Sequence, residues 1–98
     1  MTLVPSKNGT KIKKVALCTG AGSDLVKLSK RKGAQVLITG DMKYHEAQDA
    51  LDMNMNVIDC GHFDTEDIFK DVMKRFIDGF EEFETIKSEV YLNPFKII

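Results

Sequence analysis

The fold of this chain is decided by one short stretch, in which an apolar strand pattern runs through a glycine into a helix pattern. It reads Asn56-Val57-Ile58-Asp59-Cys60-Gly61-His62-Phe63-Asp64-Thr65-Glu66. A short apolar run that ends at a glycine and continues as a helix is typical of the strand-to-helix corners of α/β domains. His62 and Glu66 leave this corner four residues apart, so an imidazole and a carboxylate can converge on one cation.

The same pattern of strand, glycine and helix occurs twice more upstream. Apolar residues 15–18 lead to Thr19-Gly20-Ala21-Gly22-Ser23, and residues 35–38 lead to Thr39-Gly40-Asp41. Nearly continuous apolar strands between helices are typical of a parallel sheet that is covered on its faces. We therefore expect the sheet to be mostly parallel.

The two ends of the chain complete the expected architecture. Residues 85–92 predict a last strand, and residues 1–12 read as an irregular lead-in. The sequence thus predicts a single α/β domain over residues 1–98, with the order β-α-β-α-β-α-β, helices on the sheet faces and room for an antiparallel edge strand.

Three helices are expected between these strands. The first begins at Ser23 and stops at Gly33, the second covers residues 44–51, and the third begins at Asp64 or Thr65. The third carries an apolar stripe at helical spacing, which predicts packing against the core. Its residues are Ile68, Phe69, Val72, Met73, Phe76, Ile77 and Phe80.

Composition indicates an ordinary globular domain. The chain has 98 residues with a formal net charge of -1, 30% charged and 43% hydrophobic residues. We expect no nucleic-acid partner, because a basic excess is absent, and no membrane span, because no apolar run approaches ~20 residues. The start of the chain lacks the apolar core of a signal peptide, so the expected location is the cytoplasm. Cys18 and Cys60 are then expected to be thiols.

Right-handed crossovers would place the three glycine turns at the carboxyl edge of the sheet. That edge would gather several polar side chains, namely Asp41, His45, Asp59, Cys60, His62 and Glu66. Of these, Asp41, His45 and Asp59 are the pocket-lining candidates. Other readings stay open, since His62 could bond a backbone carbonyl and Glu66 is favoured in a first helical turn. A zinc site of Cys18, Cys60 and His62 is conceivable, although buried thiols are the simpler account.

The turn with Gly20, Gly22 and Ser23 is a candidate for anion binding through its backbone amides. It contains G-x-G but lacks the third glycine of the dinucleotide fingerprint and the Gly-Lys-Ser/Thr of a Walker A loop. A tight turn without any ligand is the alternative. No residue is assigned as a catalytic nucleophile or base.

Two blocks at this edge resemble a known family. The first block is Thr39-Gly40-Asp41-Met42-Lys43-Tyr44-His45, and the second is Gly61-His62-Phe63-Asp64-Thr65-Glu66. Together with residues 15–22 before them and Leu92-Asn93-Pro94-Phe95 after them, they resemble the carboxy-terminal part of the Nif-three-like dinuclear metal-centre proteins. These are also called GTP cyclohydrolase 1 type 2 homologues. The resemblance implies that His62 and Glu66 are metal ligands, and that Asp41 and His45 line the same pocket.

The resemblance also implies a function. It points to a metal-dependent hydrolase that uses zinc, iron or manganese and acts on a nucleotide-type substrate such as GTP. In that family an amino-terminal half supplies further ligands, and residues 1–14 do not resemble it. The metal site is therefore expected to be incomplete in this chain, with a homo-oligomer or a missing amino-terminal half as partner. The alternatives are a non-catalytic oligomerisation or partner-binding module, and a small-anion sensor.

Overall fold

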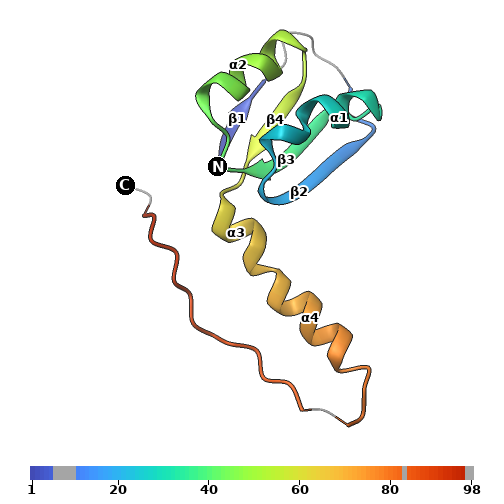
Figure 1. Cartoon of the computed structure of the whole chain (residues 1–98), viewed down its shortest axis with the longest axis vertical. Coiled ribbons are helices and arrows are strands. Elements are labelled where there is room, and N and C mark those ends of the chain that lie inside the picture. Colours follow the sequence, from blue (N-terminus) through green and yellow to red (C-terminus); the bar gives the residue numbers. More distant parts are fainter. Residues whose placement is uncertain (6–10, 83, 97–98) are drawn as a thin grey trace.

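A four-stranded mixed sheet forms the body of the molecule, seen in a computed structural model that describes residues 1–5, 11–82 and 84–96 (Figure 1). Its strands are β1 (Thr2–Val4), β2 (Val15–Ala21), β3 (Val36–Gly40) and β4 (Asn56–Asp59), in the spatial order β1-β4-β3-β2. β2, β3 and β4 are parallel, whereas β1 pairs antiparallel with β4. The expected α/β class with a mostly parallel sheet is confirmed.

The fourth strand comes from the opposite end of the chain to the one predicted. Residues 84–96 form neither helix nor strand, so the strand expected over residues 85–92 is wrong. The edge strand is instead β1, which lies inside the stretch expected to be an irregular lead-in over residues 1–12. Three residues before Pro5 are too few to show an alternating pattern, and β1 depends on its pairing with β4.

The helices follow the glycine turns. A 3₁₀ turn, η1 (Ser23–Leu25), leads into α1 (Val26–Arg31), and α2 covers Tyr44–Asp52. As expected, α1 is followed by a left-handed glycine, Gly33, with φ of +85°. The third expected helix is divided into α3 (His62–Asp67) and α4 (Phe69–Ile77).

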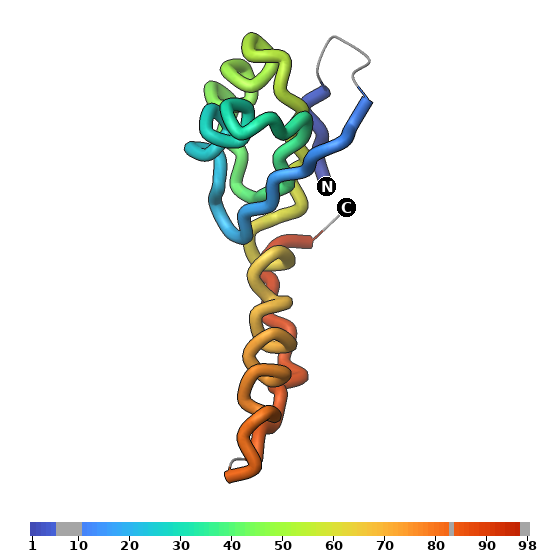
Figure 2. The backbone as a smooth tube through the Cα atoms, turned by 90° about the vertical axis from the view of Figure 1, so that its right-hand side faces the viewer, coloured from blue at the N-terminus to red at the C-terminus, as the bar shows by residue number. Residues whose placement is uncertain are grey.

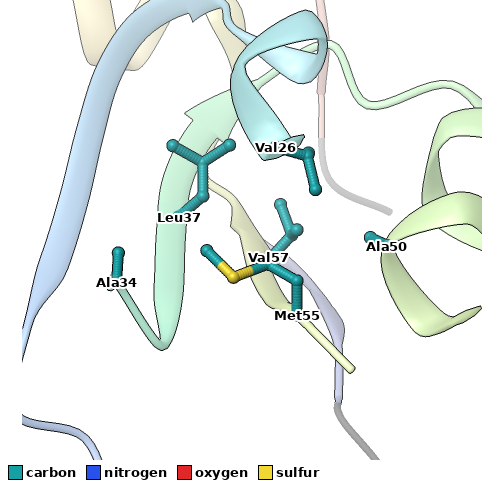
Figure 3. Close-up of a cluster of buried hydrophobic side chains, with 6 residues drawn as sticks. All are labelled: Val26, Ala34, Leu37, Ala50, Met55 and Val57. Carbon is teal, nitrogen blue, oxygen red and sulfur yellow. The ribbon is translucent and has the colours of Figure 1, made fainter. Parts of the chain in front are cut away.

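The hydrophobic core lies between one face of the sheet and helices α1 and α2 (Figure 3). Leu37 and Val57 stand side by side on adjacent strands and are almost fully buried. The cluster consists of Val26, Ala34, Leu37, Ala50, Met55 and Val57. Helices α1 and α2 therefore cover the same face of the sheet.

Helix α4 extends away from the sheet, and residues 84–96 run back beside it (Figures 1 and 2). Polar contacts join the two: Lys87 pairs with Asp71 at 2.6 Å, and the Lys70 ammonium donates to the carbonyl of Val90. Phe69 and Phe76 remain 62% and 66% exposed. The prediction that the stripe on this helix packs into the core is wrong for this chain.

Within the described residues, no helix is long and apolar enough to cross a membrane.

A candidate metal site at the carboxyl edge of the sheet

His62 and Glu66 are brought together by helix α3. They occupy the first and fifth positions of the helix, one turn apart on the same side. The His62 Nε2 atom lies 3.1 Å from Glu66 Oε2, and the two side chains are 44% and 55% exposed. An imidazole nitrogen and a carboxylate oxygen thus face one another at a surface that solvent reaches.

Asp41 holds the other nitrogen of the same imidazole. It follows β3 with a positive φ of 53°, and its Oδ2 atom lies 2.6 Å from His62 Nδ1. The hydrogen bond to Asp41 is the main cause that raises the pKa of His62; the negative charges of Glu66 and Asp41 act in the same direction and desolvation opposes them. A carboxylate on the far nitrogen is the usual support of a metal-binding histidine, because it fixes the tautomer and the ring orientation.

Asp59 braces the two loops that carry Asp41 and His62. Its Oδ2 atom accepts the amide of Met42 and its Oδ1 atom accepts the amide of Gly61, both at 2.9 Å. A carboxylate that receives two backbone amides from two loops fixes their separation. The sequence suggested only that Asp59 lines a pocket; the structure shows that both of its oxygens hold backbone.

Glycines allow these loops to approach closely. A Cβ atom on Gly40 would lie 2.6 Å from the backbone of Gly61 and His62, and a Cβ on Gly20 would lie 2.5 Å from Glu66 Oε1. Gly20 also has a φ of +69°, which L side chains rarely adopt. The ends of β2 and β3 are therefore in direct contact with the start of α3.

Thr65 joins α3 to the end of β2. Its hydroxyl accepts the amide of Gly20 at 2.8 Å and donates to the carbonyl of Gly61 at 2.8 Å. The sequence suggested Thr65 as a helix cap, but α3 begins at His62 after Gly61, and Thr65 is buried inside the helix. A threonine near a helix start gives no signal for this role, because it resembles an ordinary cap.

Within the described residues, His45 makes no contact with Asp41, His62 or Glu66, and its place in the pocket stays a prediction. Its ring packs edge-on against Tyr44, with centroids 5.5 Å apart, and the side chain is exposed on α2. Cys18 and Cys60 are free and half-buried. Among the described residues, no group of three or more histidine, cysteine, aspartate or glutamate side chains is placed to hold a metal ion.

Two polar groups of the turn after β2 already have partners. The amide of Gly20 bonds Thr65, and a hydrogen bond from Ser23 lowers the pKa of Glu46. Gly22 lies against β3, where a Cβ would come within 2.5 Å of the Thr39 hydroxyl. Close packing accounts for glycine at positions 20 and 22, and anion binding by Gly20, Gly22 and Ser23 stays a prediction.

The sequence model of the Duf34/NIF3 family (NGG1p interacting factor 3) matches residues 1–94, which include the whole of this site. This chain belongs to the NIF3 family. The resemblance found in the sequence is thereby confirmed.

Curated NIF3-family relatives are named GTP cyclohydrolase 1 type 2 homolog. The protein of Halalkalibacterium halodurans is 37% identical over 94 residues, which is 91% of this chain and 25% of the relative. The protein of Bacillus subtilis is 37% identical over 92 residues, which is 89% of this chain and 24% of the relative. The chain thus spans about a quarter of the length of these relatives.

Solved structures share the fold. A Staphylococcus aureus hypothetical protein, SA1388, superposes with a TM-score of 0.84 and 29% identity, over 99% of this chain and 29% of its own. A Bacillus cereus protein related to NIF3 gives a TM-score of 0.76 and 30% identity, over 99% of this chain and 28% of its own. In both structures, nearly the whole of the present chain superposes on less than a third of the longer protein.

Proposed function

We propose that this chain contributes the histidine–glutamate metal pair of a NIF3-family metal-dependent hydrolase. The observation that carries the proposal is the convergence of His62 Nε2 and Glu66 Oε2 at 3.1 Å, with Asp41 bonded to the far side of the imidazole. A surface ion pair alone would not require a second carboxylate to orient the ring.

The residues fit a divalent ion that accepts nitrogen and oxygen ligands, which zinc, iron and manganese all do. When bound, such an ion acts as a Lewis acid that acidifies water at neutral pH. His62 and Glu66 would hold it, and Asp41 would keep the imidazole in the tautomer whose Nε2 lone pair points outward. The name of the relatives supports a nucleotide-type substrate such as GTP.

Two ligands are too few for a closed metal site. We propose that the other ligands come from outside residues 1–98, either from the amino-terminal half of the family's fold or from further copies of the chain. The proposed location remains the cytoplasm, where Cys18 and Cys60 would stay reduced.

A second candidate function is a non-catalytic oligomerisation or partner-binding module that keeps a remnant of the metal pair. The exposed apolar residues of α4 favour it, since Phe69 and Phe76 are more than 60% exposed. Under this alternative, the assembled protein would bind its partner with no dependence on His62.

The proposal is tested by GTP hydrolysis in the assembled protein. The chain is co-expressed with the part of the Bacillus subtilis relative that it does not match, and the complex is loaded with zinc, iron or manganese. We expect hydrolysis that His62→Ala abolishes and that His45→Ala, which removes the histidine on α2, leaves intact. Activity that persists in His62→Ala would remove His62 from the metal centre, and no activity in the metal-loaded wild-type complex would favour the non-catalytic module.

A further inference from the structure

A cavity of about 770 Å³ adjoins the candidate metal site. Asp41 and His62 line it, and so do side chains from residues 91–96, where the chain returns to α3 (Figure 1). A volume of this size is typical of sites that bind small molecules. The cavity therefore places a possible ligand directly beside the imidazole of His62.

A chain of hydrogen bonds fixes one wall of this cavity. The Asn93 side-chain amide donates to the Tyr91 hydroxyl at 3.2 Å, and this hydroxyl donates to Asp64 Oδ1. The Oδ1 atom of Asn93 accepts the backbone amide of Phe95 at 3.0 Å. The ring of Tyr91 also packs edge-on against Phe63, with centroids 5.0 Å apart. Because this last segment forms neither helix nor strand, these contacts are what hold it against α3 at the cavity.

Asp64 is oriented by this chain of bonds and keeps capacity for a ligand. An ionised carboxylate only accepts hydrogen bonds, and it can accept several. The bond from Tyr91 occupies Oδ1, whereas no group among the described residues donates to Oδ2. The Asp64 side chain is exposed and lines the cavity. A ligand that offers N–H donors would therefore meet an acceptor that is already oriented.

The charges of the cavity indicate which part of a nucleotide fits it. Among the described residues, three carboxylates and one lysine line it, namely Asp41, Asp59, Asp64 and Lys96. Carboxylates repel phosphate groups, so the cavity suits the uncharged base of a nucleotide better than its phosphates. Phe95 also lines the cavity and is 83% exposed, which leaves an aromatic face on which a planar base can stack.

We propose that this cavity binds the guanine base of the substrate and that Asp64 determines the choice of base. The Watson–Crick edge of guanine presents a ring N–H beside an amino group, and one carboxylate can accept both. Adenine presents an acceptor in place of the ring N–H, which a carboxylate repels. Tyr91 is a positioning residue, because it acts through Asp64. The inference rests on the proposed function, from which the nucleotide class of the substrate comes.

The test is an NMR titration of the purified, isotope-labelled protein that carries residues 1–98, with guanosine, inosine and adenosine in turn. These nucleosides carry no phosphate, and EDTA removes metal, so only the base site is measured. We expect guanosine to shift the amide signals of residues 61–64 and 91–96. Guanosine should bind at least about tenfold more tightly than inosine, which lacks the amino group, and adenosine should bind more weakly than guanosine by at least the same factor.

Two variants and their matched controls locate the recognition. Asp64→Asn should weaken guanosine binding by at least about tenfold and narrow its advantage over inosine, because an amide oxygen replaces two acceptors with one. Asp67→Asn is the control on the same helix, since that carboxylate pairs with Lys70 instead. Tyr91→Phe keeps the ring and should narrow the same guanosine–inosine ratio, whereas Tyr44→Phe, which removes a hydroxyl on α2, should leave it unchanged.

The opposite results overturn the proposal. They are no binding of guanosine at millimolar concentration, equal affinities for guanosine and adenosine, or equal weakening by Asp67→Asn and Asp64→Asn. The base site and the metal pair can fail separately, because nucleoside binding in EDTA needs no metal and the metal content of the protein needs no nucleoside. Guanosine binding in a protein that takes up no metal would therefore keep this inference and remove the metal proposal.

Discussion

Each nitrogen of the His62 imidazole faces one carboxylate, Asp41 at Nδ1 and Glu66 at Nε2. The two contacts differ in kind. The one to Asp41 is the shorter, at 2.6 Å, and it connects two loops, whereas the one to Glu66 lies within a single helix. Asp41 therefore sets the orientation of the ring, and Glu66 shares its outer nitrogen with any cation that binds.

The raised pKa of His62 predicts a pH dependence. In the metal-free chain, NMR titration of the imidazole should give a pKa above the ordinary value of 6.5, and Asp41→Asn should lower it, because the bond to Asp41 is the largest cause. The Asp41–His62 contact then stabilises the fold below the ordinary pKa and is lost as pH rises through the raised one.

The same shift acts on metal binding. A protonated imidazole cannot ligate, so metal affinity should rise as the pH passes through the raised pKa and level off above it. Identical titration curves for wild-type and Asp41→Asn chains would contradict this account of the site.

Gly20 predicts a difference between two glycine substitutions. Gly20→Ala and Gly33→Ala both force alanine to a positive φ, which costs about 1–2 kcal/mol of unfolding free energy. Only at Gly20 does the new Cβ meet a side chain, at 2.5 Å from Glu66 Oε1, whereas nothing lies within 4 Å at Gly33. We therefore expect Gly20→Ala alone to weaken metal binding, by about tenfold.

Urea unfolding measures the loss of unfolding free energy that both variants share. Metal titration then shows whether only Gly20→Ala has a lower metal affinity. Equal metal affinities would mean that Glu66 moves aside without consequence for the site.

Two loops, after β3 and after β4, are fastened together by one side chain. Asp59 accepts the amides of Met42 and Gly61, and these neighbour Asp41 and His62. The distance between the loops, and hence the Asp41–His62 bond, depends on this carboxylate. The Asp41–His62 contact thus depends on how the two loops are held, and it forms without a bound cation.

Asp59→Ala should therefore lower stability and disturb the site together. Loss of two hydrogen bonds to a charged group in a half-buried place is expected to lower the free energy of unfolding by about 2–4 kcal/mol. Asp52→Ala, at the exposed end of α2, is the control and should change it by less than about 0.5 kcal/mol. Denaturant unfolding measures both, and a neutral Asp59→Ala would show that the loops are held by other contacts.

The sequence predicted the elements whose burial is local and missed those that depend on distant contacts. β3 and β4 carry apolar runs that end at glycines, so their places and the carboxyl edge could be foreseen. Ile86, Val90 and Leu92 resemble an alternating strand, yet they are exposed and residues 84–96 form no ladder. The apolar stripe of α4 was read as core packing because periodicity shows which side is apolar, but not whether this chain covers it.

The sequence likewise predicted part of the candidate site and missed the rest. His62 and Glu66 share a helix, so four-residue spacing brings them together. His45 was expected beside Asp41 because both follow the same strand and belong to the same family block, but α2 carries its ring onto Tyr44. The bracing by Asp59 and Thr65 was missed, since it consists of side chains that bond backbone in neighbouring loops, and such pairings leave no spacing pattern.

The whole molecule has one covered and one open side. Helices α1 and α2 enclose the core on one face of the sheet, and α3–α4 leads away from it toward solvent (Figures 1 and 2). The His62–Glu66 pair lies where the two parts meet, and Glu66 lines a cavity together with Thr19 of β2 and Phe69 of α4. A chain of this shape can hold two ligands in place and still need a partner to enclose an ion.

The most direct measurement of the central claim is the metal content of the purified chain, its His62→Ala variant and its His45→Ala variant, by elemental analysis after gel filtration without chelator. We expect zinc, iron or manganese in the wild-type and His45→Ala chains and its loss in His62→Ala, with a lower content than one ion per chain if the partner is absent. Equal metal content in the wild-type and His62→Ala chains, or no metal in any of them even after incubation with the three ions, would contradict the assignment of His62 and Glu66 as ligands.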